Sequence, residues 1–195
     1  MQPIYFPRLG MLWIDGLWLA FVVIWVIGAA KIKRAERRVA GWPRLLQVAL
    51  TAAGAVLLFD PAMNTGILGV RCLPPSAIFG DLGAAITAGG LAFAVWARFV
   101  LGRNWSSQIT LKQEHELIQS GPYRLVRHPI YSGVLLALLG TAIYIGELRG
   151  FIAFPLFVAG WWLKARVEES LLLEHFGEPY RDYQRKVKAI VPFVV

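Results

Sequence analysis

Charged side chains that can do chemistry gather in the stretch SGPYRLVRHPIYSG, directly before an apolar run. This stretch carries Arg127 and His128, and the segment VEES further along the chain supplies Glu168 and Glu169. A guanidinium, an imidazole and two carboxylates can bind an ionic ligand or transfer a proton. The same four groups can equally form an interhelical salt bridge. From the residues alone, both hypotheses stay open.

Two prolines and two tyrosines divide this stretch into the motifs Gly-Pro-Tyr and His-Pro-Ile-Tyr. Pro129 by itself is typical of the first turn of a helix, where its missing N–H costs nothing. The combination also fixes a turn and directs aromatic rings, which anchoring at a membrane surface does not require. On a helix, Glu168 shares a face with Leu171, Leu172 and His175, so it does not lie on a purely solvated stripe. These features favour a binding site.

The composition indicates a membrane protein. Of the 195 residues, 57% are hydrophobic and 16% are charged, whereas average soluble domains have about 25% charged residues. Eight tryptophans fit this interpretation, because Trp favours the membrane interface. The net charge is +8, but the basic residues fall between apolar runs, so we expect no nucleic-acid partner. Cys72 is the only cysteine, which excludes an internal disulfide and a cysteine-based metal site, and we predict no metal.

The elements that must position these groups follow from five apolar runs, at 11–30, 42–59, 77–101, 130–145 and 151–163. We predict an all-α integral membrane protein with five transmembrane helices, in a single domain that covers 1–195. Residues 1–101 would form three N-terminal transmembrane helices. Residues 102–195 would form a polar segment, a short helical hairpin and a cytoplasmic C-terminal helix. The hairpin is expected to be short because both of its apolar runs are short.

Small residues recur in the third apolar run, at Gly80, Gly83, Gly89 and Gly90. Small side chains let helices approach closely in lipid, where no hydrophobic drive brings them together. We therefore expect close helix contacts along this run. Such contacts can form within one chain or between two, so the oligomeric state stays open.

Basic residues predict the orientation in the membrane. If the block KIKRAERR is cytoplasmic, all but three of the 20 Lys and Arg residues lie on or next to the cytoplasmic side. The exceptions are Arg8, Arg71 and Arg149. This asymmetry follows the positive-inside rule. We therefore expect a bacterial inner-membrane protein with its N-terminus outside and its C-terminus in the cytoplasm.

Ordered motifs in the C-terminal half, 101–193, carry a family resemblance. Gly-Pro-Tyr, Arg-His-Pro-x-Tyr-x-Gly, Glu-Glu and Phe-Gly-x-x-Tyr follow one another in LGRNWSSQITLKQEHELIQSGPYRLVRHPIYSG and EESLLLEHFGEPYRDYQRKVKAIVPF. Together they resemble the isoprenylcysteine carboxyl methyltransferase family and, more broadly, the membrane phospholipid methyltransferases. The resemblance implies methyl transfer from S-adenosylmethionine to a lipophilic or lipid-linked acceptor at the cytoplasmic face, with membrane lipid as a partner. No G-x-G-x-x-G follows a predicted strand, so a Rossmann-type cofactor site is not expected.

The resemblance also implies roles for individual residues. It assigns catalytic roles to Arg127, Glu168 and Glu169. In the family, an arginine about one turn before the glutamates is tied to the acceptor. Here that spacing holds Lys164, with Arg166 two residues further on, so these two are the candidate substrate-binding residues. The candidate cofactor-binding residues are Gln108, His115, Glu116, Leu117, Ile118, Tyr123, His128, Pro129, Ile130, Tyr131 and Glu168.

The identity of the acceptor stays open, because lysine does not reproduce the bidentate fork of arginine. A carboxylate acceptor would need no base. A phospholipid amine, the acceptor of an N-methyltransferase, would need one, and the candidates are Glu168, Glu169 and His128. A more distant alternative is an NADPH-dependent membrane protein similar to the sterol reductases. The last alternative is a membrane protein that keeps the fold without turnover.

Overall fold

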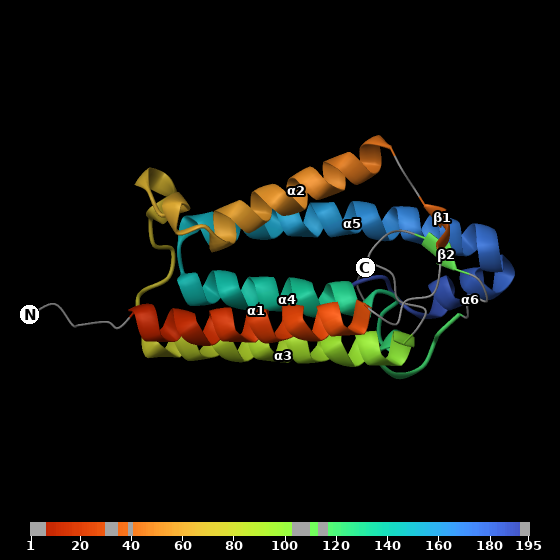
Figure 1. The fold of residues 1–195 in the computed structure, drawn as a ribbon, viewed down its shortest axis with the longest axis horizontal. Helices are drawn as coiled ribbons and strands as arrows, with labels where there is room; N and C mark the ends of the chain where they lie inside the picture. Colours follow the sequence, from red (N-terminus) through yellow and green to blue (C-terminus); the bar gives the residue numbers. More distant parts are fainter. Residues whose placement is uncertain (1–6, 30–34, 39–40, 103–109, 113–116, 192–195) are drawn as a thin grey trace, which may run out of the picture.

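The structure, a computed structural model, describes residues 7–29, 35–38, 41–102, 110–112 and 117–191. Within these residues, long helices lie side by side along one axis (Figure 1). They are α1 (Pro7–Ala29), α2 (Trp42–Phe59), α3 (Ala77–Leu101), α4 (Pro129–Ile145) and α5 (Leu148–Phe176). Neighbouring helices contact one another in the order α1, α3, α4, α5, α2. Each predicted apolar run therefore lies on its own helix.

Three of these helices, α2, α3 and α5, are long and apolar enough to cross a membrane. Shorter apolar helical stretches cover Leu12–Gly28 in α1 and the whole of α4. Only 11% of the apolar window of α2 is buried, so lipid rather than water must cover most of its apolar surface. The predicted integral membrane protein is confirmed. The count of five transmembrane helices stays a prediction.

The helical hairpin differs from the prediction in its second arm. The first arm, α4, has 17 residues, but α5 has 29 and continues to Phe176. At 1.5 Å per residue this helix is about 43 Å long, more than the ~30 Å of the hydrocarbon core. The second arm is therefore longer than predicted, because it continues without a break through the residues expected to form a separate C-terminal helix. No Gly or Pro interrupts the chain after Leu163 until Gly177, whose φ of 60° ends the helix.

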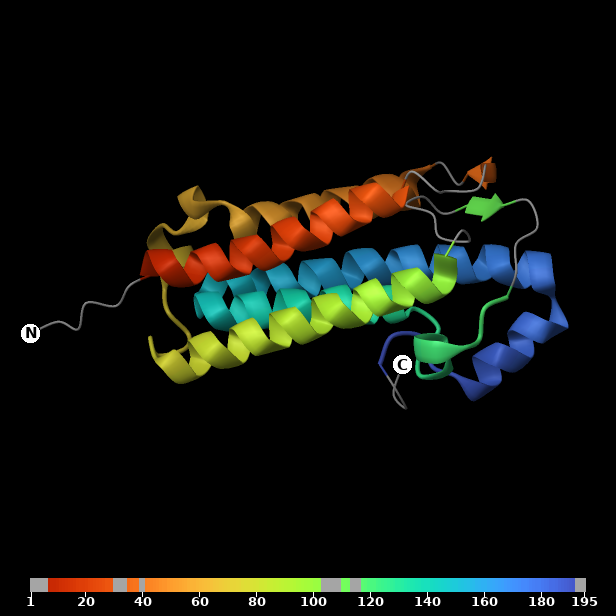
Figure 2. The same ribbon diagram turned by 60° about the horizontal axis from the view of Figure 1, so that its bottom comes forward.

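The all-α prediction misses two short strands. β1 (Ala35–Arg38) and β2 (Thr110–Lys112) pair antiparallel, with Ala35 opposite Lys112. Figure 2 shows this pair beyond the ends of α1 and α2. Because β2 also contacts α5, it fixes part of the predicted polar segment close to the extension of that helix. The other short elements are η1 (Pro61–Met63), η2 (Gly66–Gly69), η4 (Gly121–Arg124) and the helix α6 (Glu178–Lys186).

Glycines bring α3 and α4 into backbone contact. A Cβ on Gly90 would lie 2.5 Å from the carbonyl oxygen of Gly133, and one on Gly83 would lie 2.7 Å from that of Gly140. Between these crossings the Thr87 hydroxyl donates to a backbone carbonyl of its own helix and contacts the facing helix. Close packing was predicted for four glycines of this run, and the structure shows it for Gly83 and Gly90. Gly80 has one atom at 4.0 Å and Gly89 has none within 4 Å.

Gly90→Ala should lower the free energy of unfolding by about 1–3 kcal/mol, because its methyl group would overlap the backbone of α4. Thermal unfolding of the purified protein in detergent measures this loss. Gly89→Ala is the matched control: it makes the same change one residue away, where nothing lies within 4 Å. Because alanine is the better helix former, Gly89→Ala should keep or slightly raise the stability. Equal losses in the two variants would show that the contact with α4 does not set the effect.

A buried ion pair closes the end of the bundle at the α4–α5 turn. Arg149 Nε donates to Glu147 Oε2 at 2.7 Å, and Arg149 Nη1 reaches the carbonyl oxygen of Asp60 at 3.0 Å. Asn64 Nδ2 donates to the other oxygen of Glu147 at 3.3 Å. Leu58, whose carbonyl also accepts from Arg149, belongs to the α2 end that is tied down here. This network joins α2, the loop after it and α5 at the end remote from β1 and β2 (Figure 1).

Candidate functional site

The candidate site lies at the opposite end of the bundle, where the start of α4, the extension of α5 and α6 come together (Figures 1 and 2). Pro129 is the first residue of α4, so the helix begins directly after Arg127 and His128. The extension of α5 carries Glu168 and Glu169 past its apolar run. Gly177 then redirects the chain, and α6 packs beside α5.

Tyr131 is the centre of an aromatic and charged cluster. Its hydroxyl donates to Glu168 Oε2 at 2.5 Å. The imidazole of His128 stacks on its ring with a centroid distance of 5.2 Å and an interplanar angle of 3°. Lys164 Nζ lies over the same ring, 5.2 Å from the centroid, and the ring of Trp161 lies at 5.8 Å. A carboxylate, a cation and aromatic faces therefore meet around one tyrosine.

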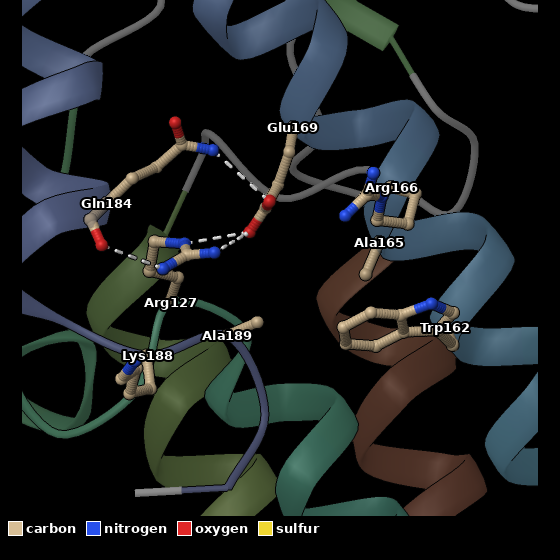
Figure 3. Close-up of a pocket in the computed structure, with 8 residues that line it drawn as sticks. All are labelled: Arg127, Trp162, Ala165, Arg166, Glu169, Gln184, Lys188 and Ala189. Carbon is tan, nitrogen blue, oxygen red and sulfur yellow. Dashed lines mark hydrogen bonds and ion pairs between the residues drawn. The ribbon is translucent and has the colours of Figure 1, made fainter. Parts of the chain in front are cut away.

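The neighbouring Glu169 has different partners. Its Oε1 accepts from Arg127 Nε at 2.7 Å and lies 2.6 Å from Arg127 Nη2. The same oxygen lies 3.1 Å from His128 Nε2, and Gln184 Nε2 donates to Oε2 at 3.2 Å. The side chains of Arg127 and Glu169 are only 10% and 12% exposed, so this is a largely desolvated ion pair (Figure 3).

The two glutamates thus differ in charge balance. Arg127 forms a direct ion pair with Glu169, whereas the described part of the chain places no cation within salt-bridge distance of Glu168. Lys164, one turn earlier on α5, interacts electrostatically with Glu168, and the hydroxyl of Tyr131 donates a hydrogen bond to it. Of the pair, Glu168 is therefore the carboxylate without a direct ion pair, and it is the one more available to a cationic ligand. The salt-bridge hypothesis is correct for Glu169 and does not describe Glu168.

The chain after α6 holds the Arg127–His128 loop through the backbone. The amide of Arg127 donates to the carbonyl of Lys188 at 2.8 Å, and that of His128 donates to Ala189 at 2.9 Å. Ser132 Oγ, one turn into α4, donates to the carbonyl of Ile190 at 2.5 Å. This segment therefore fixes the backbone from which the imidazole and the guanidinium project.

The helix α6 adds two side chains that the sequence analysis did not assign to the site. The hydroxyl of Tyr183 donates to the carbonyl of Tyr123 at 2.5 Å, and Gln184 holds Glu169. Burial raises the pKa of Tyr183 above its ordinary value, so its hydroxyl stays protonated and donates. A signal was present in the sequence: Tyr180, Tyr183 and Gln184 are spaced to share one face of a helix, and both tyrosines are buried.

Most of the described candidate residues come together. Tyr123 and Ile130 belong to one buried cluster, against which Ile118 and Tyr131 pack. His128 and Pro129 are buried beside it, and Leu117 is half-buried. The candidates Gln108, His115 and Glu116 lie outside the described residues.

The two candidate substrate-binding residues, Lys164 and Arg166, contact different parts of the site. Lys164 faces the ring of Tyr131, whereas the guanidinium of Arg166 lies over the ring of Trp162, 5.9 Å from its centroid. Arg166 instead borders a cavity of about 230 Å³ on the other side of Glu169 (Figure 3). Helix α5 lines this cavity with Trp162, Ala165, Arg166 and Glu169, and the facing wall consists of Arg127, Gln184, Lys188 and Ala189.

The fold and the site define a class: helical integral membrane proteins with an ionic and aromatic site at one end of the bundle. A family model described as Phospholipid methyltransferase matches residues 80–179, which include α4, α5 and the loop before them. The chain belongs to this family, and the family resemblance predicted from the motifs is confirmed.

Named relatives match the C-terminal half of the chain. A probable protein-S-isoprenylcysteine O-methyltransferase of Oryza sativa subsp. indica is 36% identical over 96 residues, which are 48% of this chain and 50% of the relative. The protein-S-isoprenylcysteine O-methyltransferase B of Arabidopsis thaliana is 34% identical and is covered to 49%. The enzyme of Saccharomyces cerevisiae is 31% identical over 104 residues, which are 50% of this chain and 42% of the relative. The chain spans about half the length of the curated relatives it matches.

A solved structure shares the fold. It is that of a eukaryotic intramembrane Ras methyltransferase, an isoprenylcysteine carboxyl methyltransferase, with a TM-score of 0.50 and 24% sequence identity. The match covers 77% of this chain and 52% of the solved chain. At this identity the likeness supports the helical membrane fold alone.

Proposed function

We propose that this protein is a membrane methyltransferase that transfers a methyl group from S-adenosylmethionine to a lipophilic acceptor. The observation that carries the proposal is that the adjacent residues Glu168 and Glu169 have different partners. Arg127 and His128 bind Glu169, whereas Glu168 accepts a hydrogen bond from Tyr131 and has no direct ion pair among the described residues. The family and the names of the relatives support a transferred methyl group.

The chemistry of the residues around Tyr131 fits this donor. S-adenosylmethionine supplies, when bound, a methyl group on a cationic sulfonium. Tyr123, His128 and Tyr131 offer aromatic faces, and an aromatic face attracts a cation by about 0.5–2 kcal/mol. Glu168 adds a carboxylate that can accept hydrogen bonds from the ribose or from the amino group. We therefore assign donor binding to the Tyr131 side of Glu169, together with Ile118, Leu117 and the candidates Gln108, His115 and Glu116.

We do not assign the donor to the cavity on the other side of Glu169. Its volume of about 230 Å³ is below the roughly 300–1,000 Å³ of typical small-molecule pockets. No tyrosine lines it, whereas Tyr131 contacts Glu168. The chemistry of the residues therefore favours the Tyr131 side for a cationic, nucleoside-containing donor.

The protein's part in the reaction is mainly to hold the acceptor in line with the methyl group, because alignment alone supplies much of the rate in such displacements. A cation and an anion lose charge as they react, which a site of low dielectric constant favours. We propose a carboxylate acceptor, held by Lys164 beside the Tyr131 ring. Such an acceptor needs no base, in agreement with Glu169 being tied to Arg127 and His128.

The orientation belongs to this proposal. With five transmembrane helices and the N-terminus outside, the candidate site opens at the cytoplasmic face, where the donor is dissolved. The acceptor would then enter sideways from the lipid. Protease accessibility of an epitope at each terminus, in sealed membrane vesicles, tests this topology.

Glu168→Gln should weaken binding of S-adenosylmethionine about 10- to 100-fold, because a hydrogen bond to a charged group contributes about 1.5–3 kcal/mol. Titration calorimetry of the purified protein in detergent measures the affinity. Glu174→Gln is the matched control, since it makes the same change on an exposed part of α5 and should alter the affinity less than about twofold. Equal losses in both variants, or binding of NADPH in place of the donor, would overturn the proposal.

Label from [methyl-³H]S-adenosylmethionine identifies the acceptor class in membranes that contain the protein. A methyl ester releases its label as methanol on mild alkaline hydrolysis, whereas an N-methyl group keeps it. We expect alkali-labile label in a lipid-soluble product, and much less label with Glu168→Gln at a donor concentration below the dissociation constant of the variant. Alkali-stable label in the phospholipid fraction would instead identify a phospholipid N-methyltransferase.

A further inference from the structure

A cavity beside the Arg127–Glu169 pair has the properties of a second binding site, in addition to the Tyr131 cluster. The cavity of about 230 Å³ lies between α5 and the segment that follows α6 (Figure 3). In Figure 3, Trp162 and Arg166 approach it from α5, and Lys188 and Ala189 approach it from the facing segment. Its lining combines apolar side chains with the basic residues Arg166 and Lys188 and with the Arg127–Glu169 pair.

The charges around this cavity do not cancel. Arg127 and Glu169 neutralise each other at 2.6 Å. Arg166 and Lys188 have no carboxylate within salt-bridge distance among the residues that the structure describes, so two positive charges remain. Both side chains belong to exposed residues, and a ligand can therefore reach them.

One of the two cations is oriented without being neutralised. The guanidinium of Arg166 lies over the indole of Trp162, an arrangement that favours one direction while keeping its donors available. The backbone of Lys188 is fixed because its carbonyl accepts from the amide of Arg127. The ordering cost of the Arg166 side chain is thereby partly met before a ligand arrives.

The depth of the cavity points to the membrane surface. Along α5 the apolar run ends at Leu163, and the first charges after it are Lys164 and Arg166. Trp162 lies at this transition, where tryptophan is favoured at the boundary between hydrocarbon and water. A lipid headgroup lies at this same level, with its acyl chains toward the apolar part of the helix.

We propose that this cavity binds the anionic headgroup of a membrane lipid, with the phosphate between Arg166 and Lys188 and the glycerol end against Trp162, Ala165 and Ala189. The volume is below that of typical small-molecule pockets and suits a lipid headgroup. This lipid is distinct from the proposed donor and acceptor, although the cavity shares Arg127 and Glu169 with the proposed catalytic residues and Arg166 with the candidate substrate-binding residues. Because it borders the Arg127–Glu169 pair, lipid bound here would also keep water away from the charges that hold His128.

The test uses the full chain in a neutral detergent. Native mass spectrometry with equal amounts of phosphatidylglycerol and phosphatidylcholine of the same acyl chains measures which lipid stays bound. The native protein should prefer phosphatidylglycerol, and the double variant Arg166→Gln/Lys188→Gln should lose about tenfold or more of that preference. Arg185→Gln/Lys186→Gln removes the same two charges from exposed positions outside the cavity and should keep it.

Three results would overturn the proposal. The first is a native protein without preference for the anionic lipid. The second is an equal loss in the two double variants, which would assign the preference to overall surface charge. The third is inorganic phosphate at millimolar concentration raising the melting temperature as much as the lipid does, which would identify a soluble anion as the ligand. Each single variant is measured as well, so that the test stands if the double variant does not fold.

Discussion

Glu169→Gln should lower the free energy of unfolding by about 3–5 kcal/mol, because it leaves the guanidinium of Arg127 buried without its counter-charge. The effect is expected to be large since the carboxylate is the common acceptor for Arg127, His128 and Gln184. Thermal unfolding of the purified protein in detergent, at a fixed detergent concentration, measures the change.

The exposed pair between Glu178 and Arg181 is the control for this prediction. Its charged atoms approach to 2.7 Å, as in the buried pair, but the side chains are 65% and 52% exposed. Glu178→Gln should therefore cost less than about 1 kcal/mol. Similar losses from Glu169→Gln and Glu178→Gln would contradict a role of burial in the first pair.

A double-mutant cycle separates the pair from its surroundings. Arg127→Gln combined with Glu169→Gln removes both charges, so the double variant should be more stable than the sum of the two single losses predicts. A coupling near zero would show that the backbone hydrogen bond of Arg127 with the segment after α6, rather than the ion pair, carries the stability of this loop.

The sequence predicts much of this site because short-range spacing fixes it. Arg127, His128 and Tyr131 are placed by the start of a single helix, and proline marks that start. Ser132 follows His128 by four positions, about one turn of the helix. In the structure its hydroxyl donates a hydrogen bond to the His128 carbonyl. Helical periodicity likewise places Glu168 on a face that is partly covered.

Helical spacing in the sequence does not predict the partners of the two glutamates. Glu168 and Glu169 are adjacent in the sequence, and the side that each faces depends on how α5 is rotated against α4. The backbone carbonyls of Lys188 and Ala189 accept hydrogen bonds from the loop. The sequence does not predict these bonds, because every residue has a backbone carbonyl. The length of α5 differs from the prediction for another reason. The end of the apolar run predicts a boundary between the hairpin and the C-terminal helix, but a helix continues through polar sequence until a residue such as Gly177 stops it.

At the other end of the bundle, Arg149→Gln should also lower the free energy of unfolding by about 3–5 kcal/mol, because it leaves the carboxylate of Glu147 buried without its cation. Three carbonyl oxygens of the α2 end would lose their donor as well, those of Leu57, Leu58 and Asp60. Arg149→Lys keeps the charge but not the planar fork, so an intermediate loss is expected. Thermal unfolding in detergent measures all three proteins.

Arg71→Gln is the control at the same end, because Arg71 is exposed and its Nε makes only a 3.3 Å hydrogen bond to a nearby carbonyl. It should cost less than about 0.5 kcal/mol. Well below the melting temperature, Arg149→Gln should bind S-adenosylmethionine as the native protein does, because the proposed donor site lies at the opposite end of the helices. A folded Arg149→Gln protein with strongly weakened donor binding would mean that the two ends are coupled through α4 and α5, and that the Tyr131 cluster is not positioned by its local contacts alone.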